Sequence, residues 1–308
     1  MAKVFVAGHR GLVGSALVRR LEREVGVSLV VRTRQELDLT DAGATRAFFE
    51  AERPTNVYLA AAKVGGILAN DTYPADFLRE NLLIQTNVFE AAHRVSVRRL
   101  AFLGSSCIYP RLCDQPIREE YLMTGPLEPT NSAYAIAKIA GIEMARAYRK
   151  QHGMHAISLM PTNLYGPGDN FDLAGSHVLP ALLRKMVEAK ESGAPSVTIW
   201  GSGTPKREFL HVDDLADAAV FLMNHYDSPD PINVGVGDDL SIRDLAELIR
   251  SVVGFEGELS FDTQKPDGTP RKLLDVSKLH ALGWRAKIGL REGIASTLRW
   301  YLDHRAPR

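Results

Sequence analysis

Near its start the chain reads Val4-Phe5-Val6-Ala7-Gly8-His9-Arg10-Gly11-Leu12-Val13-Gly14, and an amphipathic segment from Ser15 to Arg23 follows. The apolar run is typical of a buried parallel strand, and the segment after it is typical of a helix. Gly8 then permits a tight turn, Gly11 lets the backbone approach a pyrophosphate, and Gly14 lets the helix pack close to the strand. The stretch predicts a doubly wound, Rossmann-like α/β fold that binds a dinucleotide.

The residues after the second apolar run, 28–31, distinguish NADP from NAD. An NAD site carries a carboxylate at this place, whereas the extra phosphate of NADP calls for arginine. The chain has Arg32-Thr33-Arg34 there, and Arg10 of the glycine loop is placed to reach the same phosphate. These cations favour NADP(H). The alternative is that the arginines are solvated loop charges and that Glu36 or Asp38 holds a ribose hydroxyl.

Three more apolar runs, at 56–60, 99–103 and 156–160, predict the other strands of this half. Predicted helices from Asp41 to Glu52 and from Tyr73 to His93 separate them. This alternation indicates parallel strands with helical crossovers, in which ligands bind at the carboxyl ends of the strands. The residues that directly follow each apolar run are therefore the candidate site residues.

The stretch 130–138, Thr-Asn-Ser-Ala-Tyr-Ala-Ile-Ala-Lys, places Tyr134 and Lys138 four residues apart, on one face of a predicted helix. A tyrosine has a pKa near ~10, and a lysine held beside it favours the phenolate and brings proton transfer within range. Ser105 follows the fourth strand and lies near that helix by topology. Serine, tyrosine and lysine together predict a donor set for a carbonyl oxygen. The spacing alone is common by chance, and a half-buried tyrosine beside a lysine is the alternative.

The glycine loop, Ser105 and the Tyr134/Lys138 pair resemble the extended short-chain dehydrogenase/reductase family, and the resemblance covers nearly the whole chain. It implies that Ser105, Tyr134 and Lys138 form a catalytic triad. In the sugar-nucleotide dehydratases of that family, carboxylates follow the catalytic serine or threonine. This chain has Ser106-Cys107 at that place.

A cysteine at this place favours epimerisation. A thiol, with an ordinary pKa near ~8.5, exchanges a proton at a carbon next to a ketone once its surroundings stabilise the thiolate. The alternative for Cys107 is a small buried hydrophobe, as most free cysteines are. Cys113 has no such placement and is predicted to be structural. His177, at the start of a predicted helix running to about Glu191, is a candidate second acid/base, although a histidine there is by itself more often a surface or capping residue.

The segments 104–110, 129–138, 161–167 and 176–180 resemble those family members that epimerise and then reduce a GDP-sugar. This resemblance implies NADPH-dependent conversion of GDP-4-keto-6-deoxy-D-mannose, with proton transfer by Cys107 and His177 at carbons 3 and 5. Tyr134 would then protonate the carbon-4 oxygen during hydride transfer. The alternatives are a sugar-nucleotide 4-epimerase or 4,6-dehydratase of the same family and, from another class, a non-catalytic NADP-sensing regulator.

The resemblance also implies binding residues. Those for the cofactor are Gly8, His9, Arg10, Gly11, Leu12, Val13, Gly14, Arg34, Leu103, Gly104, Ser105, Ser106, Lys138, Pro161, Thr162, Asn163, Leu164 and His177. Those for the substrate are Lys185, Trp200, Arg207 and Asp267, with the Arg207 guanidinium suited to clamp the diphosphate. Without the resemblance, Lys185, Trp200 and Asp267 read as a solvated lysine, a core tryptophan and a turn aspartate before Gly268.

The 308 residues have no net charge, since 37 lysines and arginines balance 37 aspartates and glutamates. The protein as a whole therefore has no electrostatic attraction for nucleic acid or an anionic membrane. The two cysteines match neither a zinc pair nor a redox pair, so no metal is predicted and a reducing, cytoplasmic compartment is expected. No apolar run approaches a membrane span or a signal-peptide core.

We expect residues 1–167 to form the NADP-binding domain and residues 168–308 to form mainly the substrate lobe, with the segment near 211–240 returning to the first domain. A final amphipathic helix is predicted from Leu290 to His304. The apolar faces of the predicted helices 75–93 and 133–150 are expected to pair across a two-fold axis, which would make a homodimer.

Overall fold

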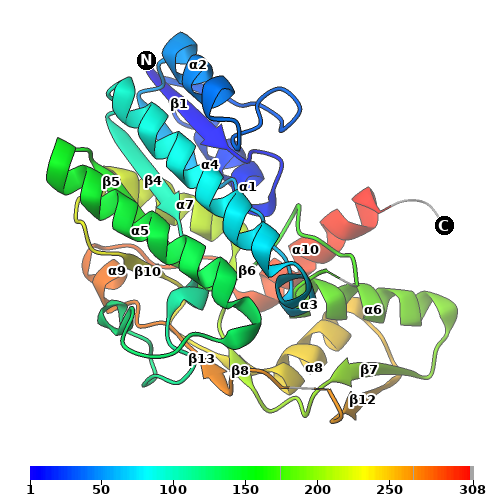
Figure 1. The fold of residues 1–308 in the computed structure, drawn as a ribbon. Helices are drawn as coiled ribbons and strands as arrows, with labels where there is room; N and C mark the ends of the chain where they lie inside the picture. Colours follow the sequence, from blue (N-terminus) through cyan, green and yellow to red (C-terminus); the bar gives the residue numbers. More distant parts are fainter. Residues whose placement is uncertain (174, 266, 306–308) are drawn as a thin grey trace.

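A computed structural model describes residues 1–173, 175–265 and 267–305. Its main sheet has six parallel strands in the order β10-β5-β4-β3-β1-β2 (Figure 1). Their bounds are β1 Ala2–Ala7, β2 Val27–Val30, β3 Asn56–Leu59, β4 Arg99–Leu103, β5 Ala156–Pro161 and β10 Ile232–Val234. The chain steps outward from β1 to β2 and then returns past β1 to β3. The doubly wound prediction is confirmed, with a topological switch point at the carboxyl ends of β1 and β3.

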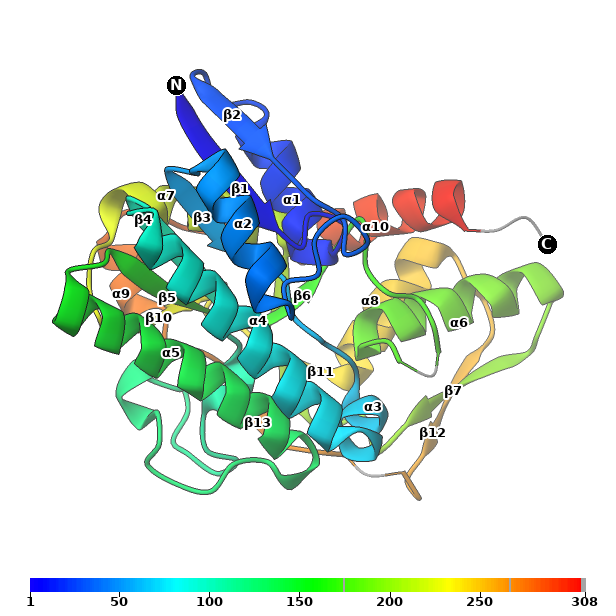
Figure 2. The same cartoon turned by 45° about the horizontal axis from the view of Figure 1, so that its top comes forward.

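Helices cover both faces of the main sheet (Figures 1 and 2). One face carries α2 (Ala42–Glu52), α4 (Pro74–Arg94) and α5 (Ser132–His152), and the other carries α1 (Leu12–Leu21) and α7 (Val212–His225). The strand β1 shows why its sequence is apolar throughout. Phe5 and Ala7 pack into the first layer, whereas Val4 and Val6 pack into the second.

Most helix boundaries follow the capping signals in the sequence. Asp41 accepts a 2.9 Å hydrogen bond from the Ala44 amide at the start of α2, and α5 ends at Gly153 in the left-handed region. The prediction for α1 was wrong at both ends, because the helix begins at Leu12 and ends at Leu21. Gly11 is its extended N-cap, and the Gly11 carbonyl already accepts from the Ser15 amide at 2.9 Å. The residues after Gly11 therefore form the first helical turn.

A second lobe surrounds a separate apolar core. It comprises α6 (Val178–Ser192), α8 (Ile242–Val253), α10 (Leu290–His304) and the paired strands β7 (Ser196–Trp200) and β12 (Glu258–Asp262). The predicted final helix is confirmed from Leu290 to His304, and the predicted return of a strand to the main sheet is confirmed by β10. In the described part of the chain, no helix has the length and hydropathy that a membrane crossing requires.

Several short elements complete the fold. A small sheet, which lies below the main sheet in Figure 1, has the order β11-β8-β13, and β6 pairs with β9. Their bounds are β6 Asn163–Tyr165, β8 Lys206–Arg207, β9 Phe209–His211, β11 Leu240–Ser241 and β13 Arg271–Lys272. The short helices α3 (Ile67–Thr72) and α9 (Ser277–Ala281) were not predicted.

Glu208, between β8 and β9, ties these parts together. Its fully buried carboxylate accepts hydrogen bonds from three backbone amides, those of Val236 at 2.6 Å, Gly237 at 2.8 Å and Leu274 at 3.0 Å. Burial raises the pKa of this carboxyl, although the three amide bonds act in the opposite direction. One side chain thus joins the small sheet to the loop after β10.

We expect Glu208→Gln to lower the free energy of unfolding in urea by about 1–3 kcal/mol, because the new NH₂ group replaces an acceptor and leaves a buried amide without one. Glu256→Gln is the matched control, since Glu256 is exposed, and its effect should stay within about 0.5 kcal/mol. Equal effects of the two substitutions would contradict this role for Glu208.

Candidate active site

The first part of the site is the turn after β4. Gly104 packs against β5, where an added Cβ would lie 2.2 Å from the end of the Met160 side chain. Ser105 has an extended backbone and caps the 3₁₀ turn Ser106–Ile108, and its hydroxyl accepts from the Cys107 amide at 3.3 Å. The turn therefore sets the Ser105 hydroxyl and the Cys107 thiol side by side at the carboxyl edge of the main sheet.

Tyr134 and Lys138 come from the first turns of α5 and face this edge. The buried Lys138 ammonium donates to the Leu103 carbonyl at 2.8 Å and lies 5.7 Å from the centre of the Tyr134 ring. Burial lowers the pKa of Lys138 to about 8. The structure thus brings together the serine, the tyrosine and the lysine that the sequence analysis grouped.

The pKa of Tyr134 differs from the prediction. Burial and the negative charge of Cys107 raise the pKa of Tyr134 well above its ordinary value, and a hydrogen bond from Ser105 offsets only part of the shift. The prediction that Lys138 favours the phenolate is wrong for this structure. The reason is that an interior of low dielectric disfavours the charged form of both side chains. Tyr134 is therefore held as a neutral phenol, which is a proton donor.

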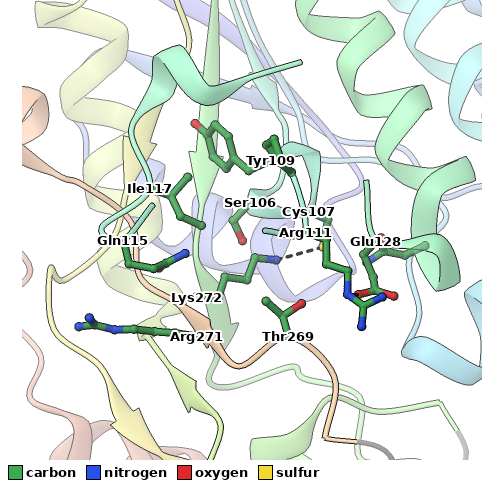
Figure 3. A pocket seen from close by; sticks show the side chains of 12 residues that line it. Ser106, Cys107, Tyr109, Arg111, Gln115, Ile117, Glu128, Thr269, Arg271 and Lys272 are labelled. Atoms are coloured by element: carbon green, nitrogen blue, oxygen red, sulfur yellow. Dashed lines mark hydrogen bonds and ion pairs between the residues drawn. The ribbon is translucent and has the colours of Figure 1, made fainter. Parts of the chain in front are cut away.

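The Cys107 thiol lies next to a cation that the sequence analysis did not identify. Its Sγ is 3.5 Å from the Nζ of Lys272 in β13, as the dashed line in Figure 3 marks. Burial raises the pKa of the thiol, but Lys272, Ser105 and Arg207 together outweigh burial and bring the pKa below its ordinary value. A thiolate at this position is what proton abstraction requires. Cys113 differs, because burial and the charge of Asp114 raise its pKa.

His177 is the N-cap residue of α6, as predicted for the start of that helix. The residue is exposed to solvent. Crowding by the surrounding protein lowers the pKa of the imidazole, and the positive charge of Lys272 lowers it further. His177 and Cys107 are thus placed around the same ammonium group.

The glycine loop has the geometry of a phosphate cradle. Gly8 has a φ of +84°, and an added Cβ would lie 2.8 Å from the backbone of Ala61. A Cβ at Gly14 would lie 2.0 Å from the Gly8 carbonyl oxygen, whereas one at Gly11 would meet only that oxygen, at 3.5 Å. Gly8 and Gly14 are therefore required by packing, and Gly11 leaves the loop open toward a ligand.

His9 gives a second indication of a ligand at this loop. Its Nδ1 is buried, and it has no hydrogen-bond partner within residues 1–173, 175–265 and 267–305. Buried polar atoms normally have partners, so an orphaned one calls for a group that binds there. Leu12 and Val13 lie in the first turn of α1, where free helix amides suit an anion. The loop fits the pyrophosphate of a dinucleotide.

The two arginines after β2 separate into different roles. Arg32 forms an ion pair with Glu52 at 2.6 Å and donates to the Val31 carbonyl, so it is structural. The Arg34 side chain is 70% exposed, and its nearest carboxylates, Asp38 and Glu80, lie at 3.6 and 3.5 Å. Arg34 is the arginine of this pair that remains available to an added phosphate.

The carboxylates proposed as an alternative are engaged locally. Glu36 accepts from the Thr33 amide at 2.7 Å, and Asp38 accepts from the amide and the hydroxyl of Thr40 at 2.9 and 2.8 Å. Arg10 is exposed on the glycine loop. The region fits the 2′-phosphate of NADP better than a bare ribose hydroxyl.

The end of β5 carries the further residues that were predicted to contact the cofactor. Pro161 ends the strand, and the Thr162 amide donates to the Val234 carbonyl at 3.0 Å. The Asn163 side chain donates to the Glu208 carbonyl at 2.8 Å, and Leu164 follows it in β6. These predicted contacts therefore lie where the chain passes from the main sheet toward the small sheet.

The predicted substrate residues lie on and near the small sheet and the second lobe. Trp200 is 61% exposed, so it is no core tryptophan, and its ring lies 5.5 Å from the Lys185 ammonium and 5.4 Å from that of Lys265. Lys185 also donates to the Thr198 carbonyl at 3.2 Å. An exposed aromatic ring flanked by two cations suits a flat, anionic ligand.

Arg207 and Asp267 lie close to each other. Burial lowers the pKa of Arg207, and the charges of Asp267 and Cys107 oppose that shift. The Asp267 carboxylate accepts from the amide and the hydroxyl of Ser202 at 2.7 and 2.8 Å, so it binds a turn of its own chain. A substrate contact for Asp267 stays a prediction.

The sequence analysis missed Lys272, and no local signal identifies it. It lies 165 positions from Cys107, in a strand of two residues. It lines the same pocket as Ser106, Cys107 and Asn131, shown in Figure 3. Tertiary contacts, among them the pairing of β13 with β8, bring it to the site.

Known proteins are similar to this chain over most of its length. The model of the NAD dependent epimerase/dehydratase family matches residues 4–235. The chain is 61% identical to a putative GDP-L-fucose synthase 2 of Arabidopsis thaliana, over 98% of this chain and 92% of that protein. It is 56% identical to the GDP-L-fucose synthase of Escherichia coli (strain K12), over 98% and 97%.

Among solved structures, a GDP-L-fucose synthetase from Naegleria fowleri bound to NADP is similar with a TM-score of 0.91 and 31% identity, covering 98% of this chain and 94% of that one. The family match extends over more than half of the chain, from the glycine loop to the strand that returns to the main sheet. The chain belongs to the NAD dependent epimerase/dehydratase family, as its resemblance to the extended short-chain dehydrogenases/reductases implied.

Proposed function

We propose that this protein catalyses the reaction of a GDP-L-fucose synthase, in which NADPH-dependent conversion of GDP-4-keto-6-deoxy-D-mannose yields GDP-L-fucose. The observation that carries the proposal is the Cys107 thiol, two residues after Ser105 and 3.5 Å from the Lys272 ammonium. It puts a proton-transfer group where dehydratases of the family have carboxylates. The relatives at 56–61% identity, which are named as GDP-L-fucose synthases, support the same conclusion.

Epimerisation needs a base and an acid on a ring with acidic C–H bonds. The carbon-4 ketone acidifies the hydrogens at carbons 3 and 5, and removal of one sends its electron pair to the ketone oxygen. Cys107 and His177 are the two groups that exchange protons at these carbons, and return of the proton on the opposite face inverts the centre. The Ser105 hydroxyl donates a hydrogen bond to the oxygen and stabilises its developing charge.

Reduction then uses the same oxygen. NADPH supplies the hydride, and Tyr134, held as a neutral phenol by burial, donates the proton. Lys138 would hydrogen-bond the ribose of the bound cofactor, close to the phenol. Arg207, with Trp200 and Lys185 nearby, holds the GDP portion through the diphosphate. The same ketone oxygen thus takes part in both steps.

The runner-up is a sugar-nucleotide 4-epimerase or 4,6-dehydratase. Such an enzyme keeps its cofactor and consumes no net NADPH, and it needs no thiol at position 107. The deciding experiment supplies GDP-4-keto-6-deoxymannose and NADPH in deuterated water. The proposal expects stoichiometric oxidation of NADPH and deuterium at two ring carbons. Exchange without oxidation would favour the runner-up, and binding of NADPH without either reaction would favour a regulator.

We expect Arg34→Gln to raise the KM for NADPH about tenfold, since a charged hydrogen bond to a phosphate contributes ~1.5–3 kcal/mol and solvent weakens it here. The KM for NADH should stay unchanged. The measurement is the ratio of kcat/KM for the two cofactors. Arg46→Gln is the control, because Arg46 is exposed on α2 away from the loop. An unchanged ratio in Arg34→Gln would assign the phosphate to other residues.

The proposal extends to the organisation of the protein. We assign cofactor binding mainly to residues 1–167 and substrate binding mainly to residues 168–308. A homodimer is proposed through α4 and α5, which lie side by side on the outside of the main sheet (Figure 1). Two free cysteines fit a reducing cytoplasm. Light scattering on the purified protein tests the dimer.

A further inference from the structure

The function proposed above assigns Lys272 no chemical step, yet its side chain is aimed at the catalytic thiol. We propose that Lys272 is a positioning residue that keeps Cys107 as a thiolate, so that the base of the epimerisation is assembled from the main sheet and the small sheet together. The inference rests on the proposed function for its effect on turnover. The ion pair itself is measured without substrate.

The backbone fixes Lys272 in this place from two sides. In the small sheet, Lys272 pairs with Arg207 and Arg271 pairs with Lys206, so Lys272 and Arg207 lie on one face of the sheet. The next residue, Leu273, bonds through both its amide and its carbonyl to the segment after Cys107. Its amide donates to the Gln115 side chain at 2.9 Å, and its carbonyl accepts from the Ile117 amide at 2.7 Å. The segments that carry the thiol and the ammonium are thus tied together.

The charges around the pocket show why the ammonium acts on the thiol. Arg271 points away from Cys107 in Figure 3 and pairs with Asp239. Arg111 pairs with Glu128 at 3.3 Å. Within the described chain, Lys272 forms an ion pair with no carboxylate, and the Cys107 sulfur is the side-chain atom that it bonds. A half-buried ammonium is stabilised by an anion beside it.

The other groups that face the sulfur do not supply a competing negative charge. Ser105 donates or accepts a hydrogen bond, Tyr134 is a neutral phenol, and Arg207 carries a positive charge. His177 also responds to Lys272, which disfavours the imidazolium. The surroundings therefore favour an anion at Cys107, and Lys272 makes the closest charged contact.

The proton step balances with this assignment. The thiolate forms an S–H bond as the C–H bond of the sugar breaks, and the electron pair moves to the ketone oxygen. The negative charge leaves the sulfur but stays near the positive charges of Lys272 and Arg207. Because Arg207 also holds the diphosphate in the proposed function, substrate binding and thiol activation depend on the same pair of short strands.

The test is the pH dependence of iodoacetamide alkylation at Cys107, in a Cys113→Ser background and without substrate. The wild-type thiol should titrate below its ordinary pKa of ~8.5. Lys272→Met should raise the apparent pKa by about one pH unit or more, and Lys272→Arg should restore most of the shift. The matched control is Lys206→Met, which removes the same charge from the exposed partner strand and should leave the titration unchanged.

Two outcomes overturn the proposal. One is an unchanged thiol pKa in folded Lys272→Met, with folding checked by circular dichroism and NADPH binding. The other outcome needs no Lys272 variant. The ultraviolet difference spectrum between wild type and Cys107→Ser follows ionisation of the Cys107 thiol, and a pKa at or above ~8.5 would overturn the proposal. Supporting results would include slow deuterium exchange in Lys272→Met that recovers as pH rises through the new thiol pKa. If Lys272→Met shifts the pKa of Cys107 but the wild-type protein does not react with the GDP-sugar, the ion pair is supported and the proposed function is wrong.

Discussion

Cys107→Ser is expected to lower the rate of deuterium incorporation into GDP-4-keto-6-deoxymannose by about 10²–10⁴-fold, the range typical of a lost general base. The substitution keeps nearly the same shape, but a serine hydroxyl is a far weaker acid than a thiol and stays protonated even 3.5 Å from the Lys272 ammonium. The Ser105 hydroxyl, which caps the turn through the amide at position 107, keeps its bond. The fold and the NADPH site should therefore be intact.

Mass spectrometry of the recovered sugar measures the exchange, and NADPH oxidation measures the reduction. Any NADPH that Cys107→Ser oxidises should yield a sugar with unchanged configuration at carbons 3 and 5. Cys113→Ser is the matched control, because it makes the same substitution at a thiol whose pKa is raised. If Cys107→Ser exchanges deuterium as fast as the control, the assignment of the base would have to be abandoned.

The parts of the fold that the sequence predicted are those with strong local signals. The helix α4 begins at Pro74, a residue that favours the first position of a helix. The helix α10 has the same first and last residues as the helix predicted from its apolar periodicity. The strands β8 and β13 could not be predicted in this way. Each has two residues, which are too few to show an alternating pattern, and the strands pair only through tertiary contacts. The start of α1 was misplaced because the glycines that allow the turn also fit a helical first turn.

The site follows the same division. Ser105, Cys107, Tyr134 and Lys138 were identifiable because strand ends and helix spacing place them together. Lys272 was not, since its role depends on a contact across 165 positions. The different roles of Arg32 and Arg34 likewise depend on a residue distant in sequence, because Glu52 forms an ion pair with Arg32. The direction of the Tyr134 pKa was misjudged because spacing shows proximity to Lys138 but not the burial that dominates both groups.

Tyr134→Phe is the second large effect, and it should fall on reduction alone. Removal of the phenolic hydroxyl takes away the proton donor to the carbon-4 oxygen, so NADPH oxidation should slow by about 10²–10⁴-fold. Deuterium exchange should persist, because Cys107, His177 and Lys272 are untouched. The ring keeps its edge-to-face packing with Phe77, at 6.4 Å between centroids, so the substitution should not disturb α5.

The matched control is Tyr73→Phe, which removes a hydroxyl from a side chain that is 58% exposed. Single-turnover oxidation of NADPH and the deuterium content of the sugar are followed in the same sample. The pH profiles should also separate. Exchange rises with pH through the depressed thiol pKa, because the base acts deprotonated, whereas reduction stays independent of Tyr134 ionisation through neutral pH, because burial keeps the phenol protonated. Equal losses of exchange and reduction in Tyr134→Phe would mean that the phenol also moves protons at the ring carbons, and the division of labour between sulfur and phenol would then be incorrect.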